Sequence, residues 1–354
     1  MSIPATHASW SIQHPLKPDF ANLTLGSRPT PKPTGKQVLI RVKAVSLNAR
    51  DCQIASGTYP APIQVEANIV PGSDAAGDVV AVGDEVTRVK LGDRVMPIFA
   101  QSFLHGDHDP DYQKQGLGGG IDGVLAEYFI CDESGLVHIP ESLNYVEAST
   151  LVVAALTSWH SLYAHPGAVL LPGETVLVLG TGGVSIFAAQ IALAAGCKVI
   201  ATSSSDEKLA RAKALGVQGG VNYRTHKEWH EEVLKLNGGR GVDHVIEVGG
   251  KGTLQRSIRS TRPGGNVWII GYMSDYKEAE EEKVEFAKEI LYTQAVVRGV
   301  VCGSRDMFEA MNRAVEATKL KPVVDKVFKW EDTIEAYRYL DSGKHFGKVC
   351  IELA

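Results

Sequence analysis

VLVLGTGGVSIFAAQIALAAGCKVIATSSSDEKL, residues 176–209, is the stretch that decides the fold class. A run rich in valine and leucine ends in a glycine turn, an apolar segment of helical character follows, and a second apolar run ends in three serines. Strand, glycine turn, helix and strand in this order predict two parallel strands joined by a helix. Such a turn leaves backbone N–H groups free at the helix N-terminus, where they can bind a phosphate.

The alternation of helix-like and strand-like segments continues from about residue 145 to residue 270. The strand-like runs GVNY, VDHVIEVGG and NVWIIGY are separated by segments of helical character. Regular alternation of this kind predicts an α/β fold of the Rossmann type, a doubly wound parallel sheet with helices on both faces.

The first part of the chain has a different character. Between residues 36 and 139, short runs rich in valine and isoleucine are interrupted by Gly-Asp turns, which predicts an irregular β-barrel. The tail after residue 305 ends in the strand-like GKVCIEL and is expected to return to this first domain. The expected segments are a barrel domain at 1–144, the doubly wound domain at 145–303 and the return to the barrel at 304–354.

The composition is that of a folded globular protein. The chain has 354 residues, 44% of them hydrophobic and 22% charged, and its length suggests about two domains. A net charge of -5 without a stripe of lysine and arginine argues against nucleic acid as a partner. The N-terminus does not resemble a signal peptide, and the longest apolar runs fall far short of the roughly 20 residues that span a membrane. The five scattered cysteines form no CxxC pair and are typical of reduced thiols in a cytoplasmic protein.

The glycine turn has the pattern of a dinucleotide-binding site. Gly180 permits the tight turn and Gly182 lets a pyrophosphate approach the backbone, while the dipole of the following helix attracts the anion. Ser185 stands where a third glycine is usual, and it is small enough for the helix to pack closely on the strand. A plain glycine turn in a parallel sheet is the alternative interpretation. The predicted contacts of the dinucleotide at this turn are Gly180, Thr181, Gly182, Gly183 and Val184.

The end of the second strand predicts which dinucleotide binds. Sites for NAD place an acid about 20 residues after the turn, where it accepts a hydrogen bond from the ribose 2′-OH. Here the strand ends with the neutral Ser203 and Ser204, and Lys208 follows one turn into the next helix. Tyr223 and Arg224, at the end of the third strand, are expected on the other side of the adenosine. These residues favour NADP, used as NADPH.

Two other interpretations of this segment stay open. Ser204 and Glu207 also fit a capping box, which needs no ligand. Asp206 is an acid close to the expected position, and a hydrogen bond from the ribose to its carboxylate would reverse the preference to NAD.

A set of short segments runs through nearly the whole chain: VSLNARD, SGTYP, PGSDAAGDVVAVGDEVTRVKLGDRV, AALTSWHSL, PGETVLVLGTGGVS, VNYR, GGRGVDHVIEVGG, RPGGNVWIIG and FGKVCIEL. In this order the segments resemble the medium-chain dehydrogenase/reductase superfamily, and specifically its zinc-free branch that is similar to quinone oxidoreductases and related to alcohol dehydrogenases. The resemblance implies a GroES-like catalytic domain built from both chain ends, with the Rossmann domain inserted between them.

Departures from the zinc-dependent members of this superfamily predict a site without metal. Zinc alcohol dehydrogenases place a cysteine just after the first strand of the catalytic domain and a Gly-His-Glu sequence downstream, where this chain has Asn48 and Gly72-Ser73-Asp74. Their lobe with four clustered cysteines is replaced by a loop at 101–120 without cysteine. Within that loop, HGDHDPD at 105–111 is rich in groups that can bind zinc, and an ordinary polar loop is its other interpretation.

The resemblance also implies which residues take part in the reaction. Asn48 is expected as a polar group of the active site and Thr157 as a neighbour of the nicotinamide. Tyr59 is a candidate donor to a substrate oxygen, with packing on the barrel as its alternative role. Some quinone oxidoreductases carry a tyrosine five residues after that asparagine, where this chain has Gln53. Further contacts with the cofactor are expected at Gly271 and Val301.

The expected function is therefore reduction of a small quinone or α,β-unsaturated carbonyl by NADPH without metal. One alternative is a zinc-independent alcohol or aldehyde dehydrogenase, although no group is evident that would polarise the oxygen in place of zinc. A second alternative is a non-catalytic NADPH-binding protein, because no strong proton donor is evident. The β-rich run AVVRGVVCG at 295–303 is expected at the rim of the Rossmann sheet, where pairing of edge strands favours a homodimer.

Overall fold

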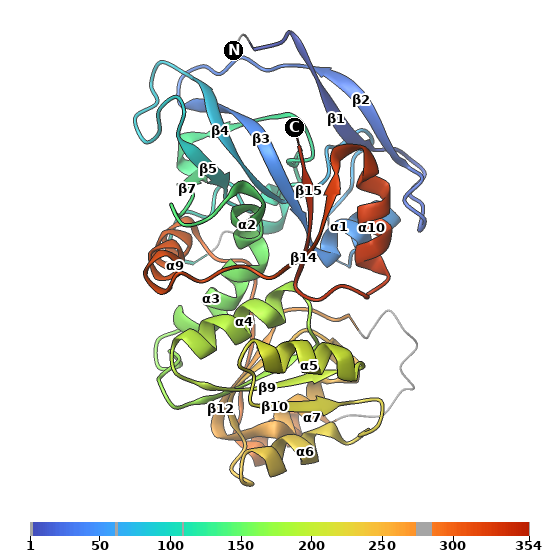
Figure 1. Ribbon diagram of the computed structural model, residues 1–354, viewed down its shortest axis with the longest axis vertical. Coiled ribbons are helices and arrows are strands. Elements are labelled where there is room, and N and C mark those ends of the chain that lie inside the picture. The colour runs from blue at the N-terminus through green and yellow to red at the C-terminus, as the bar shows by residue number, and fades with distance from the viewer. Residues whose placement is uncertain (1–2, 61–62, 108–109, 274–284, 354) are drawn as a thin grey trace. The chain divides into compact units, whose positions relative to one another are not determined.

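The computed structural model describes residues 3–60, 63–107, 110–273 and 285–353. The chain forms two compact units (Figure 1). The terminal unit consists of Met1–Leu156 and Cys302–Ala354, and the central unit consists of Thr157–Val301. Among the described residues, no helix is both long and apolar enough to cross a membrane.

The first boundary between the units falls after residue 156, whereas the sequence analysis placed it after residue 144. The intervening segment begins with helix α2 (Tyr145–Ser149), which Asn144 caps by accepting a hydrogen bond from the N–H of Glu147. Helix α2 packs on strands of the terminal unit, and Ala148 and Ser149 on it are buried. The helical character of the segment was visible in the sequence, but the sheet on which it packs was not.

The central unit contains a parallel sheet in the order β10-β9-β8-β11-β12-β13. This is the Rossmann order. Successive strands are added on one side of β8 as far as β10, and the next three, beginning with β11, are added on its other side. The predicted doubly wound α/β fold is therefore confirmed. The strands are β8 (Thr175–Leu179), β9 (Lys198–Ser203), β10 (Gly219–Asn222), β11 (Val242–Glu247), β12 (Thr261–Ile269) and β13 (Val296–Gly299).

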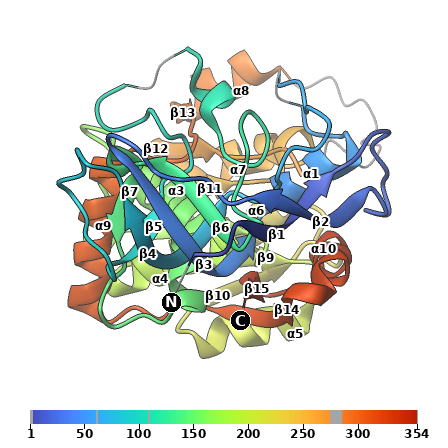
Figure 2. The same ribbon diagram turned by 90° about the horizontal axis from the view of Figure 1, so that it is seen from above.

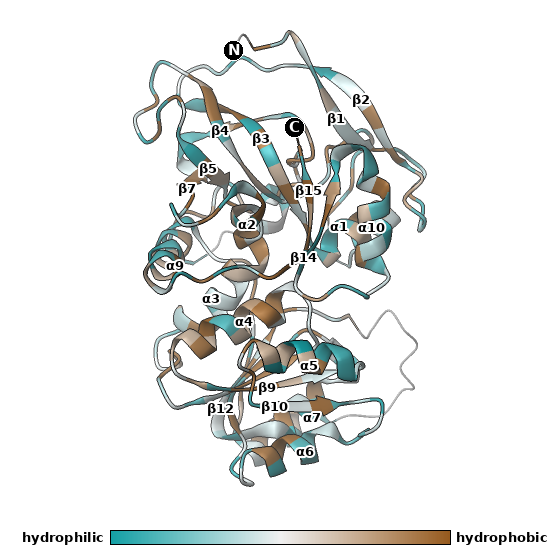
Figure 3. Ribbon diagram, in the orientation of Figure 1, coloured by the Kyte–Doolittle hydropathy of each residue, from teal (hydrophilic) through white to brown (hydrophobic). Residues whose placement is uncertain are grey.

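Helices of the central unit cover this sheet. Helices α4 and α5 pack on β8, β9 and β10, whereas α6 and α7 pack against each other and on β10, β11 and β12. Helix α4 is apolar along most of its length and largely buried, while α5 is more hydrophilic (Figure 3). The helices are α3 (Leu156–Tyr163, whose first residue belongs to the terminal unit), α4 (Gly183–Ala194), α5 (Asp206–Ala214), α6 (Trp229–Leu236), α7 (Leu254–Ser260) and α8 (Phe286–Thr293).

The terminal unit is built around one long strand, β3 (Gln37–Leu47), which pairs with β4, β6 and β15 (Figure 2). Shifts of register along the β3–β4 pair bend the sheet, as bulges do in barrels. The C-terminal strand β15 lies antiparallel to β3 with Val349 opposite Leu47, so the last residues of the chain complete this unit. The other strands are β1 (Thr6–Ile12), β2 (Leu23–Pro29), β4 (Asp74–Val82), β5 (Arg94–Pro97), β6 (Tyr128–Asp132), β7 (Leu136–His138), β14 (Val324–Lys329) and β15 (Lys348–Glu352).

Helices and a hairpin surround the sheet of the terminal unit. Strands β1 and β2 pair only with each other among the named strands, and apolar side chains of β1 join the core. Helix α10 packs on α1, β14 and β15, so both chain ends contribute to one core. The helices are α1 (Ala49–Ser56), α9 (Arg305–Thr318) and α10 (Thr333–Asp341), and a π-helical turn at Leu151–Ala155 precedes α3.

Candidate functional site

The glycine turn of the central unit has the geometry of a phosphate cradle. Strand β8 ends at Leu179, and Gly180 follows with φ +71°, a left-handed conformation that side chains disfavour. Gly182 is the N-cap of α4, and as a glycine it has no side chain to cap the first turn. The first N–H groups of a twelve-residue helix are therefore left for a ligand, at the carboxyl end of a central parallel strand.

Ser185, which replaces the third glycine, has a defined role in this turn. Its side chain is buried, and its Oγ donates a hydrogen bond of 2.6 Å to the carbonyl oxygen of Leu179. The hydroxyl thus satisfies the last carbonyl of β8 while the helix stays close to the strand. The carbonyl of Val184 accepts a hydrogen bond of 2.9 Å from Ser158 Oγ, and Thr181 is buried.

The carboxyl end of β9 lies beside the carboxyl end of β8. Ser203 is buried, its Oγ accepts a hydrogen bond of 3.2 Å from the N–H of Ser205, and its carbonyl accepts one of 3.0 Å from the N–H of Tyr223. Tyr223 follows β10 directly, and the residue is 40% exposed. Ser204 is half-buried, and Lys208 lies in the first turn of α5.

The capping box proposed for Ser204 and Glu207 is wrong by one residue. Ser205 is the N-cap of α5, and its Oγ accepts a hydrogen bond of 3.3 Å from the N–H of Lys208. The three consecutive serines made the cap ambiguous in sequence, and the helix begins one residue later than the capping box assumed. Ser204 therefore takes no part in the cap.

Asp206, the acid that favours the NAD alternative, is held by the next strand. It is the first residue of α5, and its Oδ1 accepts a hydrogen bond of 2.8 Å from Asn222 Nδ2 at the end of β10. This bond uses one oxygen of the carboxylate, so Oδ2 can still accept a hydrogen bond from a ribose hydroxyl.

The other predicted cofactor residues also follow strands or lie beside them. Gly271 comes after β12, and Val301 comes after β13, where its carbonyl accepts a hydrogen bond of 2.8 Å from Nδ1 of His160. Thr157 is buried in α3, and its carbonyl accepts a hydrogen bond of 2.9 Å from Ser161 Oγ. Because all strands of this sheet are parallel, the residues after β8, β9, β12 and β13 gather where the carboxyl ends of the strands lie.

Glu247, at the carboxyl end of β11, was not predicted from the sequence. It ends β11 and is fully buried, and its Oε1 accepts hydrogen bonds from the N–H groups of Gly249 and Gly250 and from Thr253 Oγ1, at 2.7, 2.9 and 2.6 Å. Ser257 Oγ donates to its other oxygen. Burial raises the pKa of Glu247, although these hydrogen bonds oppose the shift. The side chain thus holds the loop after β11 in shape, and the signal for it was an acid at the end of the apolar run VDHVIE.

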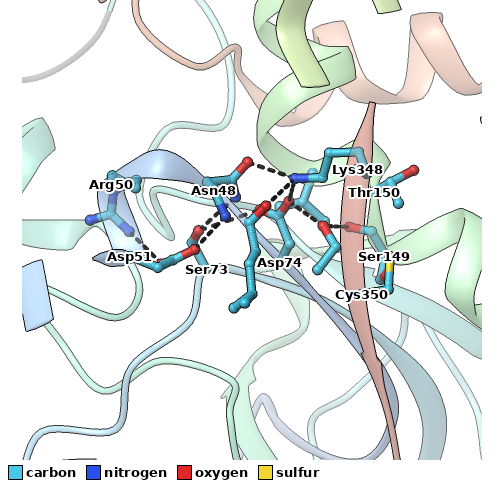
Figure 4. A network of polar contacts seen from close by, with 12 residues as sticks. Asn48, Arg50, Asp51, Ser73, Asp74, Ser149, Thr150, Lys348 and Cys350 are labelled. Atoms are coloured by element: carbon cyan, nitrogen blue, oxygen red, sulfur yellow. Dashed lines mark hydrogen bonds and ion pairs between the residues drawn. The ribbon is translucent and has the colours of Figure 1, made fainter. Parts of the chain in front are cut away.

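A second candidate site lies in the terminal unit, where α1 begins (Figure 4). Asn48 is the N-cap of α1, and its backbone N–H donates a hydrogen bond of 2.7 Å to Oδ2 of Asp51. Burial raises the pKa of Asp51 to about 6. Through its hydrogen bond to the Asn48 N–H, Asp51 braces the turn from which the Asn48 side chain projects.

Four side chains at this point form a closed ring of polar contacts (Figure 4). Lys348 Nζ donates to Asn48 Oδ1 at 2.7 Å and to Asp74 Oδ2 at 3.2 Å. Asn48 Nδ2 donates to Ser73 Oγ at 3.3 Å, and Ser73 Oγ donates to Asp74 Oδ1 at 3.4 Å. Lys348 also donates to the carbonyl of Leu47 at 2.9 Å. Lys348 was not predicted as a site residue, although a lysine inside the apolar run FGKVCIEL required a partner for its charge.

The ring does not suit a zinc ion. Asn48, Ser73 and Asp74 occupy the positions that the resemblance assigns to the zinc ligands, but Asn48 and Asp74 bind the ammonium of Lys348 and Ser73 bridges these two side chains. Zinc prefers thiolate, imidazole and carboxylate ligands, and a second cation beside this ammonium would be repelled. No group of three or more His, Cys, Asp or Glu side chains suited to a metal occurs in the described part of the chain. His108 and Asp109 of the HGDHDPD loop lie outside the described residues.

Tyr59, the second candidate donor, lies beyond the other end of α1. It is half-buried against the core of the terminal unit, and the Arg50 guanidinium lies 5.4 Å from its ring centroid and 4.7 Å from that of Phe99. Arg50 Nη1 also donates a hydrogen bond of 2.9 Å to the carbonyl of Leu117. Arg50, which the sequence analysis did not consider, therefore ties α1 to the 101–120 loop and supports the Tyr59 ring.

Comparison with known proteins gives consistent relatives for both units. The family model of the alcohol dehydrogenase GroES-like domain matches residues 34–141, and that of the zinc-binding dehydrogenases matches residues 183–317. A zinc-type alcohol dehydrogenase-like protein of Schizosaccharomyces pombe is 42% identical over 90% of this chain and 91% of its own length. A quinone oxidoreductase of Pseudomonas aeruginosa is 32% identical over 79% of this chain and 78% of its own length. The crystal structure of an NAD-dependent alcohol dehydrogenase superposes with a TM-score of 0.85 at 32% identity, covering 98% of this chain and 100% of that one. The chain therefore belongs to the medium-chain dehydrogenase/reductase superfamily of oxidoreductases.

Proposed function

We propose that this protein uses NADPH to reduce a quinone or an α,β-unsaturated carbonyl compound, without a metal. The observation that carries the proposal is the Asn48 amide, whose oxygen is bound by Lys348 in the place where zinc-dependent relatives are expected to hold their metal. Similarity to the quinone oxidoreductases of Pseudomonas aeruginosa and Homo sapiens, at 32% and 27% identity, supports the same reaction class.

The central unit offers a site that fits the cofactor. The turn at 180–184 and the uncapped start of α4 would hold the pyrophosphate, and Thr157, Gly271 and Val301 are the candidate neighbours of the nicotinamide. Ser203, Ser204, Lys208 and Tyr223 would surround the adenosine ribose and its 2′-phosphate. When bound, NADPH supplies the hydride for the reduction.

The amide of Asn48 suits the reduction of a conjugated substrate. Hydride addition to a quinone or enone delocalises negative charge onto an oxygen, which a neutral N–H donor can stabilise. Asn48 is the candidate donor, with Tyr59 as a second, and water can supply the proton. A saturated alcohol or aldehyde offers no such delocalisation and depends more strongly on a metal or another cation at its oxygen.

One specific observation favours a second candidate function. An NAD-dependent alcohol dehydrogenase and a zinc-type alcohol dehydrogenase-like protein are among the relatives that cover nearly the whole chain. A metal-independent alcohol or aldehyde dehydrogenase is therefore the competing proposal. The non-enzymatic alternative is a protein that binds NADPH without turnover.

The test is a substrate panel with protein dialysed against a chelator. Oxidation of NADPH is followed at 340 nm with quinones, enones and saturated aldehydes, and reduction of NADP with primary alcohols, while elemental analysis measures zinc. We expect turnover of at least one quinone or enone by protein that contains far less than one zinc per chain. Oxidation of alcohols without activity on any quinone or enone would support the competing proposal. Tight NADPH binding without any turnover would support the non-enzymatic alternative, a protein that only binds NADPH.

Lys208→Glu is expected to abolish the preference for NADPH. We expect the unmodified protein to bind NADPH at least tenfold more tightly than NADH, a difference of about 1.4 kcal/mol, because a cation beside the site attracts the 2′-phosphate. Reversing that charge should weaken NADPH binding and leave NADH binding nearly unchanged, as measured by fluorescence titration. Lys213→Glu, an exposed change on the same helix, is the control. Equal or tighter binding of NADH by the unmodified protein would indicate that Asp206 binds the ribose.

We further propose a homodimer formed through the edge of the central sheet. Strand β13 is at the edge of this sheet, and the residues Val296 on it and Leu291 and Tyr292 on α8 are 50%, 69% and 76% exposed. A second β13 could pair with this edge and cover the apolar side chains. Sedimentation at micromolar concentration should give about twice the chain mass, and Val296→Lys should lower it towards that of one chain. A monomeric mass for the unmodified protein would contradict the proposal.

All five cysteines are free. Free thiols are typical of proteins in reducing compartments, and we therefore propose a cytoplasmic location.

A further inference from the structure

We propose that Lys348 is a positioning residue for the reaction, which fixes the orientation of the Asn48 amide so that an N–H, rather than the carbonyl oxygen, faces the substrate. The inference rests on the proposed function, in which Asn48 stabilises the substrate oxygen. It concerns a residue about three hundred positions away from Asn48 in sequence, which contacts it through the pairing of β15 with β3.

The contacts on both sides of the amide require the same orientation. An ammonium can only donate hydrogen bonds, so the Asn48 atom 2.7 Å from Lys348 Nζ has to be the oxygen. On the other side, the Ser73 hydroxyl donates to Asp74 and is therefore free to accept from the Asn48 nitrogen. An amide turned by 180° would place its N–H groups against the ammonium.

One N–H of Asn48 is left over by the ring. The amide nitrogen carries two hydrogens, and the structure gives it one acceptor, Ser73 Oγ, in the described part of the chain. The side chains of Lys348 and Asp74 are 2% and 0% exposed and Ser73 is buried, whereas Asn48 is half-buried. Asn48 is therefore the member of the ring that can present a donor to a bound molecule.

The charge of Lys348 has a second effect on this donor. A cation bound to an amide oxygen withdraws electron density from the nitrogen, so the remaining N–H becomes a stronger donor. Asp74 balances the charge of Lys348, so the ring carries no net charge with which to attract an anionic ligand. The effect of Lys348 should therefore appear in the rate of reduction more than in substrate affinity.

The backbone holds Lys348 in place on β15. Gly347 precedes it with φ +84°, and a Cβ at this position would lie 2.4 Å from the carbonyl oxygen of Val323. Only glycine permits this approach. On the other side, Val349 is paired with Leu47, the residue before Asn48, so the lysine is held next to the start of α1 by the register of two strands.

Lys348→Met tests the inference by removing the charge while keeping most of the volume. We expect kcat for enone or quinone reduction to fall by about 10- to 100-fold, with KM and the Kd of NADPH changed less than about threefold. Lys348→Arg, which keeps a donor cation, should recover part of the rate. Lys344→Met, at an exposed position shortly before β15, is the control and should match the unmodified protein.

A double-mutant cycle separates positioning from a merely structural role. If Lys348 acts through Asn48, then Lys348→Met in an Asn48→Ala background should lower kcat less than about twofold further. Equal losses in the two backgrounds would overturn the inference. Lys348→Met leaves Asp74 buried without its cation, so this variant can fail to fold. In that case Asp74→Asn/Lys348→Met replaces it in the cycle. Combined with Asn48→Ala, this double variant should give the same result.

An NMR measurement tests the contact between Lys348 and Asn48 without turnover. In protein labelled with ¹⁵N at asparagine, the Asn48 side-chain resonances are assigned by their loss in Asn48→Ala. We expect Lys348→Met to shift them and Lys344→Met to leave them unchanged. Absence of reductase activity in the unmodified protein, together with this shift, would overturn the proposed function and leave the contact intact. An unchanged Asn48 resonance in Lys348→Met would overturn the inference itself.

Discussion

Asn48→Ala should lower kcat for the reduction of a quinone or enone by about 100-fold, while the affinity for NADPH changes little. Removal of one donor to a developing oxyanion typically costs two to three orders of magnitude in kcat, about 3 kcal/mol. Asn48 is not among the residues proposed to bind the cofactor, so its loss should change cofactor binding little. Steady-state kinetics with the best substrate of the panel and a separate NADPH titration measure the two effects.

Asn48→Asp is the matched variant for this prediction. A carboxylate keeps the volume and can still accept a hydrogen bond from Lys348, but it offers no N–H and adds a negative charge where the substrate oxygen becomes negative. We expect a loss of kcat at least as large as that of Asn48→Ala. Asn312→Ala, on α9, is the control. Unchanged kcat in both variants at position 48 would remove Asn48 from the mechanism and leave the reaction class to the substrate panel.

Asp74→Asn should have the largest effect on stability. Asp74 and Lys348 form a buried ion pair at 3.2 Å, and Asp74 also accepts a hydrogen bond of 2.8 Å from Ser46 Oγ. Removing one charge of a buried pair leaves the other without compensation, which lowers the free energy of unfolding by about 3 kcal/mol. Urea unfolding followed by circular dichroism measures the change, provided that it is reversible.

The second charge provides the control for this stability effect. Lys348→Met added to Asp74→Asn removes the uncompensated ammonium and should restore a large part of the lost stability. Asp107→Ala, an exposed aspartate of the same unit, should change the free energy of unfolding by less than about 0.5 kcal/mol. If Asp74→Asn behaves like Asp107→Ala, the ion pair does not contribute as its burial implies.

The features that the sequence predicted well are short-range patterns. The glycine turn between β8 and α4 and the alternation of strands and helices both depend on neighbouring residues. Such patterns determine local conformation, because the period of apolar residues and the position of glycine act within a few residues. The serines at the end of β9 show the limit of this reasoning, since three adjacent candidates for one cap differ only in where the next helix begins.

The sequence by itself determined the resemblance to zinc alcohol dehydrogenases, which implies that Asn48, Ser73 and Asp74 occupy positions of zinc ligands there, because a resemblance needs only residue types and their order. Only the tertiary structure decided what these side chains do. The partner that orients Asn48 comes from the last strand of the chain, and contact between them depends on the register of β15 on β3 and on the close approach at Gly347. Contacts at such separation arise from the packing of the whole unit, in which a buried lysine must find its carboxylate, and a local pattern carries no information on which carboxylate that is.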